Sequence, residues 1–96
     1  MNLLNNQSVK ITVSGLVQGV GFRYSTKEIA EHYSISGSVK NMANGNVLII
    51  ASGSKQNLDK FINEIKTSPN SFAQIQNVKV QPVKLNQHPR SFTIKI

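Results

Sequence analysis

A junction between a predicted strand and a predicted helix, at residues 8–33, most constrains how this chain can fold. Apolar side chains alternate at Val9, Ile11 and Val13, which predicts a strand over about residues 8–14. A loop with three glycines in seven positions follows, and apolar residues then recur at helical spacing from Phe22 to Tyr33. A glycine-punctuated loop therefore delivers the chain directly from its first strand into an amphipathic helix.

The rest of the chain extends this pattern. Gly37 follows the expected end of the first helix and is expected to act as its breaker, and a second strand is predicted over about residues 36–42. Asn44-Gly45 is a strong two-residue hairpin signal and leads into a strand at about 46–52, whose apolar run suits the centre of a sheet. Gly53 and Ser54 are expected to open a second helix, with Ser54 as its N-cap.

Two more strands complete the set, at about 75–83 and at the alternating C-terminus from residue 92 to residue 96. The first six elements, strand-helix-strand-strand-helix-strand, are those of the ferredoxin-like split β-α-β arrangement. We therefore predict an α+β sandwich, with two helices on one face of a mostly antiparallel sheet and one added C-terminal strand.

Length and composition indicate one small domain. We expect residues 1–7 to form a flexible tail and residues 8–96 to form a single domain. There is no cysteine, and no apolar run approaches the roughly 20 residues of a membrane helix. We expect a cytoplasmic protein with no membrane partner.

The glycine loop is suited to an anion. Gly19 and Gly21 let backbone N–H groups converge, and the helix start adds a positive dipole end. Arg23 adds a planar, permanently charged fork that fits a phosphate or a carboxylate. No Walker A or dinucleotide-binding pattern is present, and an ordinary strand-to-helix turn with a surface arginine explains the spacing equally well.

Asn41 is a second candidate. In the predicted sheet the first two strands run parallel with the third between them, so their carboxyl ends lie at the same edge of the sheet. Asn41, at the end of the second strand, can therefore face the glycine loop at the end of the first. Its amide could hold a water in a fixed orientation. By itself the residue is explained better as preparation for the Asn44-Gly45 turn.

Two motifs resemble the signatures of the acylphosphatases. The first is Gly15-x-Val17-Gln18-Gly19-Val20-Gly21-Phe22-Arg23, and the second is Gly37-Ser38-Val39-Lys40-Asn41-x-x-x-Gly45-x-Val47, with Gly53 following. The similarity extends from about Val9 to Ile96. It implies a ferredoxin-like fold and hydrolysis of the carboxyl–phosphate bond of acyl phosphates, with no metal and no cofactor.

The resemblance also implies roles for particular residues. Arg23 would bind the substrate phosphate, Asn41 would orient the attacking water, and the loop from Gln18 through Gly19, Val20 and Gly21 to Phe22 would offer backbone N–H groups to phosphate oxygens. One position departs from the family pattern, because Ser38 stands where a large aromatic residue is usual. We expect activity to persist, with local packing and substrate preference affected.

The predicted site lacks a general acid and a general base. All four acidic residues fall on the predicted helices, and His32 and His88 have no second ligand at metal spacing. An acyl phosphate tolerates this, because its leaving group is a carboxylate whose conjugate acid has a pKa of about 4. A phosphate oxygen of the substrate could accept the proton of the water, as the resemblance also suggests.

Two other classes of function fit parts of this sequence. The net charge of +7 suits a nucleic-acid-binding module, but the predicted central strands carry no aromatic residue on which bases could stack. A regulatory domain without activity could use the same loop, although pure binding would not need Asn41. We expect a monomer that does not bind nucleic acid, whose partner is a small acyl phosphate and whose product, inorganic phosphate, inhibits competitively.

Overall fold

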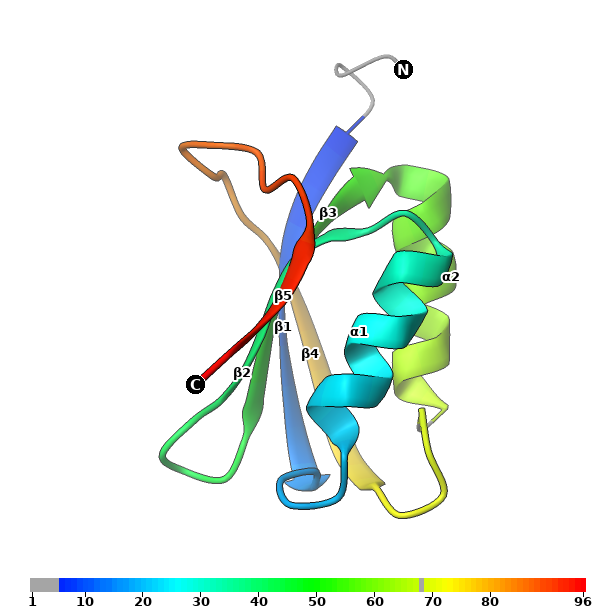
Figure 1. Cartoon of the computed structure of the whole chain (residues 1–96), viewed down its shortest axis with the longest axis vertical. Coiled ribbons are helices and arrows are strands. Elements are labelled where there is room, and N and C mark those ends of the chain that lie inside the picture. Colours follow the sequence, from blue (N-terminus) through cyan, green and yellow to red (C-terminus); the bar gives the residue numbers. More distant parts are fainter. Residues whose placement is uncertain (1–5, 68) are drawn as a thin grey trace.

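In the computed structural model, which describes residues 6–67 and 69–96, two helices pack on one face of a five-stranded sheet (Figure 1). The sheet has the order β4-β1-β3-β2-β5. The elements along the chain are β1 (Asn6–Leu16), α1 (Phe22–His32), β2 (Ser36–Asn41), β3 (Val47–Ser54), α2 (Lys55–Lys66), β4 (Gln74–Pro82) and β5 (Phe92–Lys95). The predicted ferredoxin-like arrangement is confirmed.

The sheet pairing explains how the first and second strands reach a common edge. β3 lies between β1 and β2 and runs antiparallel to both, with Val47 opposite both Val13 and Asn41. β5 pairs with β2 in parallel, so the C-terminal end of β5 lies beside the C-terminal end of β2. The predicted placement of β3 at the centre is therefore confirmed.

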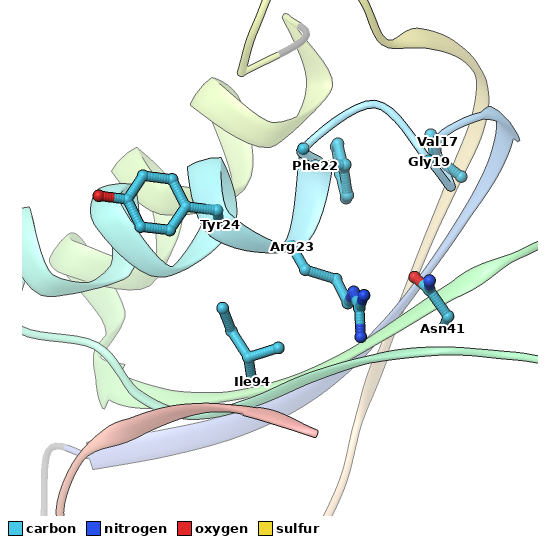
Figure 2. A pocket seen from close by; sticks show the side chains of 8 residues that line it. Val17, Gly19, Phe22, Arg23, Tyr24, Asn41 and Ile94 are labelled. Atoms are coloured by element: carbon cyan, nitrogen blue, oxygen red, sulfur yellow. The ribbon is translucent and has the colours of Figure 1, made fainter. Parts of the chain in front are cut away.

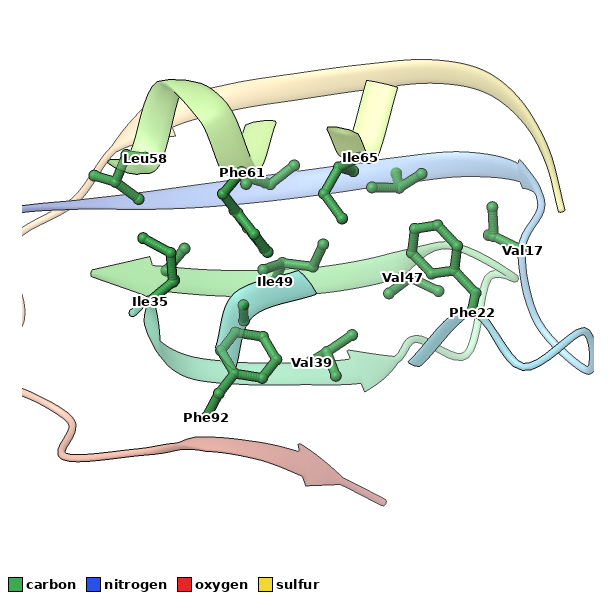
Figure 3. Close-up of a cluster of buried hydrophobic side chains, with 14 of the residues drawn as sticks. Val17, Phe22, Ile35, Val39, Val47, Ile49, Leu58, Phe61, Ile65 and Phe92 are labelled. Carbon is green, nitrogen blue, oxygen red and sulfur yellow. The ribbon is translucent and has the colours of Figure 1, made fainter. Parts of the chain in front are cut away.

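The core lies between the helices and the covered face of the sheet (Figure 3). Alternate residues of β1 and β3, such as Ile11 and Ile49, are fully buried there, and Phe61 of α2 packs over them. Between the helices, the Tyr33 hydroxyl donates a hydrogen bond to the Glu64 carboxylate. This bond raises the pKa of Tyr33 above its usual value.

Three local predictions differ from the structure. β1 begins at Asn6, so Asn6 and Gln7 belong to the sheet, where they pair with Ser54 and Gly53; the remainder of the expected tail, residues 1–5, lies outside the described residues. Both Gly53 and Ser54 belong to β3, although Ser54 is the N-cap of α2 as predicted.

Gly37 follows the first helix and lies in the predicted strand, but it is not the breaker of that helix. It lies inside β2 with φ 140°, and a Cβ there would sit 1.8 Å from the carbonyl oxygen of Ile50. Close approach of two strands, rather than helix termination, therefore requires glycine at this position. The helix itself ends at His32, and Ser34 takes the positive φ, of 56°, that follows it.

Candidate active site

The loop between β1 and α1 leaves the start of the helix uncapped by any side chain. Gly19 and Gly21 both have φ 77°, a backbone conformation that other residues rarely adopt. Gly21 is the N-cap of α1, and the first helical hydrogen bond runs from the Ser25 N–H to its carbonyl oxygen at 3.0 Å. The N–H groups before Ser25 therefore have no acceptor within the helix, and the dipole makes this end positive.

Arg23 lies in the first turn of α1 and reaches across the site toward the sheet (Figure 2). Its Nη1 donates a hydrogen bond to the carbonyl oxygen of Lys95, at 3.2 Å. Within residues 6–67 and 69–96, the ion pairs are Lys27 with Glu31 and Lys55 with Asp59, so Arg23 has no carboxylate partner there. The C-terminal strand thus holds the guanidinium in place, and its charge is not neutralised.

Asn41 ends β2 on the face of the sheet that the helices cover. Val39, two residues earlier, points into the core, and Asn41 shares that face at the rim. Figure 2 shows its amide and the Arg23 guanidinium pointing toward one another. The Oδ1 atom of Asn41 is buried and has no hydrogen-bond partner among the described residues, so it can accept a hydrogen bond from a molecule that enters the site.

The Gln18 side chain ties the glycine loop to the hairpin that carries Asn41. Its Nε2 donates to the carbonyl oxygens of Met42, at 2.7 Å, and Asn46, at 2.8 Å. Sequence reasoning expected only the backbone of Gln18 to contribute, and it missed this contact. The two bonds join the loop to the hairpin that follows β2, so they connect the two segments that carry Arg23 and Asn41.

These elements enclose a pocket of about 190 Å³. Its lining contains the two predicted catalytic residues and much of the predicted loop, together with Val17, Tyr24 and Ile94, which were not predicted. The full lining is Val17, Gly19, Gly21, Phe22, Arg23, Tyr24, Asn41 and Ile94. Gln18 and Val20, which the prediction placed in the phosphate loop, do not line it, because the Gln18 side chain binds the hairpin and Val20 packs against the core.

The pocket is positive and contains no carboxylate. All four acidic residues lie on the helices and none of them lines the pocket. Across the described part of the chain, no three histidine, cysteine, aspartate or glutamate side chains are grouped as they would be around a metal ion. A cavity with a guanidinium fork, a helix start that no side chain caps and one amide oxygen that has no partner among the described residues suits an oxyanion and a water.

Ser38, the position that departs from the family pattern, lies outside this pocket. It is opposite Ile50 and Thr93 in the sheet, on the face that the helices leave open, whereas Asn41 is on the covered face. Ser38 instead lines a separate surface hollow with Leu85 and Pro89. The missing aromatic residue therefore changes packing on the open face without removing a group from the pocket.

The fold and the pocket define a class: ferredoxin-like proteins with a glycine loop between the first strand and the first helix, next to a pocket that contains an arginine. Residues 9–94 match the family model described as acylphosphatase. A protein named acylphosphatase from Oceanobacillus iheyensis is 40% identical over 87 residues, which cover 91% of this chain and 96% of that protein.

Two solved acylphosphatase structures have the same fold as this chain. The crystal structure of acylphosphatase from Bacillus subtilis superposes with a TM-score of 0.87 at 31% identity, covering 93% of this chain and 98% of that one. An acylphosphatase from Coxiella burnetii gives 0.88 at 29% identity, covering 99% and 100%. The chain belongs to the acylphosphatase family, and its activity is the hydrolysis of acyl phosphates.

Proposed function

We propose that this acylphosphatase binds the phosphoryl group of its substrate between Arg23 and the backbone N–H groups of the β1–α1 loop, and that Asn41 orients the attacking water. The observation that carries the proposal is the buried Oδ1 of Asn41, which has no partner among the residues that the structure describes and lies in the same pocket as the Arg23 guanidinium. An amide oxygen in that position can accept a hydrogen bond from a water molecule.

Arg23 supplies the charge. A guanidinium has five N–H donors, and the bond to Lys95 uses only Nη1, which leaves donors for two phosphate oxygens at once. The N–H groups at the start of α1 add donors that need no movement during the reaction. Together they stabilise the charge that spreads over the phosphoryl oxygens in the transition state.

Asn41 supplies the position of the nucleophile. Its Oδ1 accepts a hydrogen bond from the water and directs the lone pair of the water oxygen toward phosphorus. A bond forms between that oxygen and phosphorus while the bond from phosphorus to the acyl oxygen breaks. The proton of the water passes to a phosphate oxygen, and the carboxylate leaves without being protonated, since its conjugate acid has a pKa of about 4.

The pocket and the sheet also bear on the oligomeric state, the inhibitor and the partners that we propose for this enzyme. Every group in the pocket comes from a single chain, so a monomer suffices, and inorganic phosphate should compete for the same donors. On the open face of the sheet, β1 and β3 present residues such as Lys10, Thr12 and Ile50, with no aromatic residue for stacking bases, which argues against nucleic acid as a partner. Across residues 6–67 and 69–96, no helix has the length and apolar character to cross a membrane, and we place the enzyme in the cytoplasm.

The test is hydrolysis of benzoyl phosphate by the purified chain, in EDTA, beside Arg23→Lys and a phosphate monoester as substrate. We expect metal-independent turnover of benzoyl phosphate and weak turnover of the ester, because an alcohol is a far poorer leaving group. Arg23→Lys should be severely impaired, since a point charge does not reproduce a bidentate fork. Turnover that EDTA abolishes, or a fully active Arg23→Lys variant, would contradict the proposal.

A further inference from the structure

We propose that Asn70 is a positioning residue of the phosphate pocket, which fixes the peptide between Val20 and Gly21 so that the Gly21 N–H faces the bound phosphoryl group. The inference rests on the proposed function. Asn70 lies fifty positions from Val20, in the segment between α2 and β4. Figure 1 shows this segment at the same end of the molecule as the β1–α1 loop.

The Asn70 amide makes contacts on both of its sides. Its Nδ2 donates to the carbonyl oxygen of Val20 and to the Oγ of Ser25, each at 3.1 Å. Its Oδ1 accepts from the backbone N–H groups of Phe72 and Ala73, each at 2.9 Å. Because a backbone N–H can only donate, these two bonds fix which amide atom is oxygen, and Nδ2 must face the loop.

The contact with Val20 determines where the next N–H points. In a planar trans peptide the C=O and the N–H point in opposite directions. Asn70 binds the Val20 carbonyl oxygen and does not line the pocket, whereas Gly21 does, so the Gly21 N–H points away from Asn70, toward the pocket side. Gly21 lines the pocket, and a Cβ built on Gly21 would lie 3.9 Å from the Asn70 Nδ2, so the amide sits directly behind this peptide.

The loop needs such an anchor because of its composition. Gly19 and Gly21 flank Val20, and glycine restricts its own backbone less than any other residue. A donor that must already be aligned when the phosphoryl group arrives requires a fixed peptide. The second bond, to Ser25, joins the first turn of α1 to the same amide, so the loop and the helix start are held as one unit.

The decisive variant is Asn70→Asp, which keeps an oxygen for Phe72 and Ala73 but removes the donor to Val20. We expect the Ki for inorganic phosphate and the KM for benzoyl phosphate to rise about tenfold, as for a lost hydrogen bond to a charged group, with a smaller change in kcat. In an NMR titration, phosphate should shift the Gly21 amide much less in the variant than in the wild type, while the amide of Gly19 still responds.

Two controls separate positioning from charge and from folding. Ser71→Asp puts the same charge on the neighbouring exposed residue without touching Val20, and Ser25→Ala removes only the other acceptor of Nδ2. Ser71→Asp should leave the phosphate Ki within about twofold. Ser25→Ala keeps the bond to Val20 and should raise the phosphate Ki much less than Asn70→Asp does. Equal Ki values for Asn70→Asp and Ser71→Asp, in folded proteins with an active wild type, would overturn the role of Asn70 alone. A wild type that neither binds phosphate nor hydrolyses benzoyl phosphate would overturn the proposed function, and this inference with it.

Discussion

The two strand-to-helix junctions of the molecule are built in opposite ways. At the second, α2 starts directly after β3, and the Oγ of Ser54 accepts a hydrogen bond from the Asn57 N–H at 3.1 Å. At the first, a loop separates β1 from α1, and the N-cap is Gly21, which offers no side chain. The second junction gives one N–H of its helix start a side-chain acceptor, whereas the first gives its helix start none and places an arginine beside it. The pocket occurs where the cap is absent.

The difference shows that a binding site can arise where a helix start lacks a capping side chain, and not only where a side chain is added. A capped helix start is more stable by about 1 kcal/mol but has fewer N–H groups to offer. An uncapped start is less stable and binds anions. Each of the following variants changes one junction and uses the other as its reference.

The largest effect is expected from the first-turn cations of the two helices. Arg23→Ala should lower kcat/KM for benzoyl phosphate at least about 10³-fold, because in the proposed mechanism it removes the charge that stabilises the transition state. Lys55→Ala, in the first turn of α2, removes an exposed cation that pairs with Asp59 and should change kcat/KM less than about twofold. Steady-state kinetics measure both, and similar losses in the two variants would mean that general positive charge, rather than the first junction, drives the reaction.

The next largest effect is expected from Asn41→Ala. If Asn41 orients the water, kcat should fall roughly 10²-fold or more while the Ki for inorganic phosphate stays nearly unchanged. Asn57→Ala, at the second junction, should leave both constants unchanged. A large rise in the phosphate Ki of Asn41→Ala would reassign this residue to binding the phosphoryl group.

Gly21→Ala tests the geometry of the open cap. A Cβ at Gly21 has room, but the φ of 77° costs an alanine about 1–2 kcal/mol, so the loop should distort. We expect the phosphate Ki to rise several-fold with a modest loss of thermal stability, measured by inhibition kinetics and by thermal unfolding. An unchanged Ki would show that the glycine conformation at this position does not matter for binding.

The smallest effect on activity is expected from Ser54→Ala, which removes the cap at the second junction. The free energy of unfolding should fall by about 1 kcal/mol, which lowers the Tm by about 4–8 °C in a domain of this size. The kcat and the phosphate Ki should not change. Loss of activity in a folded Ser54→Ala protein would show that the two junctions are coupled.

Sequence reasoning predicted the fold and much of the lining because those features depend on local pattern. The alternation of Val9, Ile11 and Val13 and the Asn44-Gly45 turn each specify their own segment. The parallel relation of β1 and β2 placed Arg23 and Asn41 at the same end of the predicted sheet, but only the resemblance to the acylphosphatases selected them as site residues. The structure brings both into one pocket.

Contacts between distant segments could not be predicted in the same way. Nothing in the sequence near Asn70 indicates that its amide reaches Val20, or that the carbonyl of Lys95 holds Arg23. The side chain of Gln18 could have been suspected, because a glutamine beside two glycines has no local partner, but its acceptors lie on another hairpin. Gly37 shows the same limit, because the carbonyl that requires glycine there belongs to β3.

The most direct test of the central claim is a phosphate titration followed by the backbone amide signals of the ¹⁵N-labelled protein. The account predicts saturable shifts in the amides of Gly19, Gly21, Phe22 and Arg23, with the amides of Lys55 to Asn57 at the second junction unaffected. Shifts of equal size at both junctions, or a response confined to the lysines of the open sheet face, would contradict the assignment of the pocket to the uncapped start of α1.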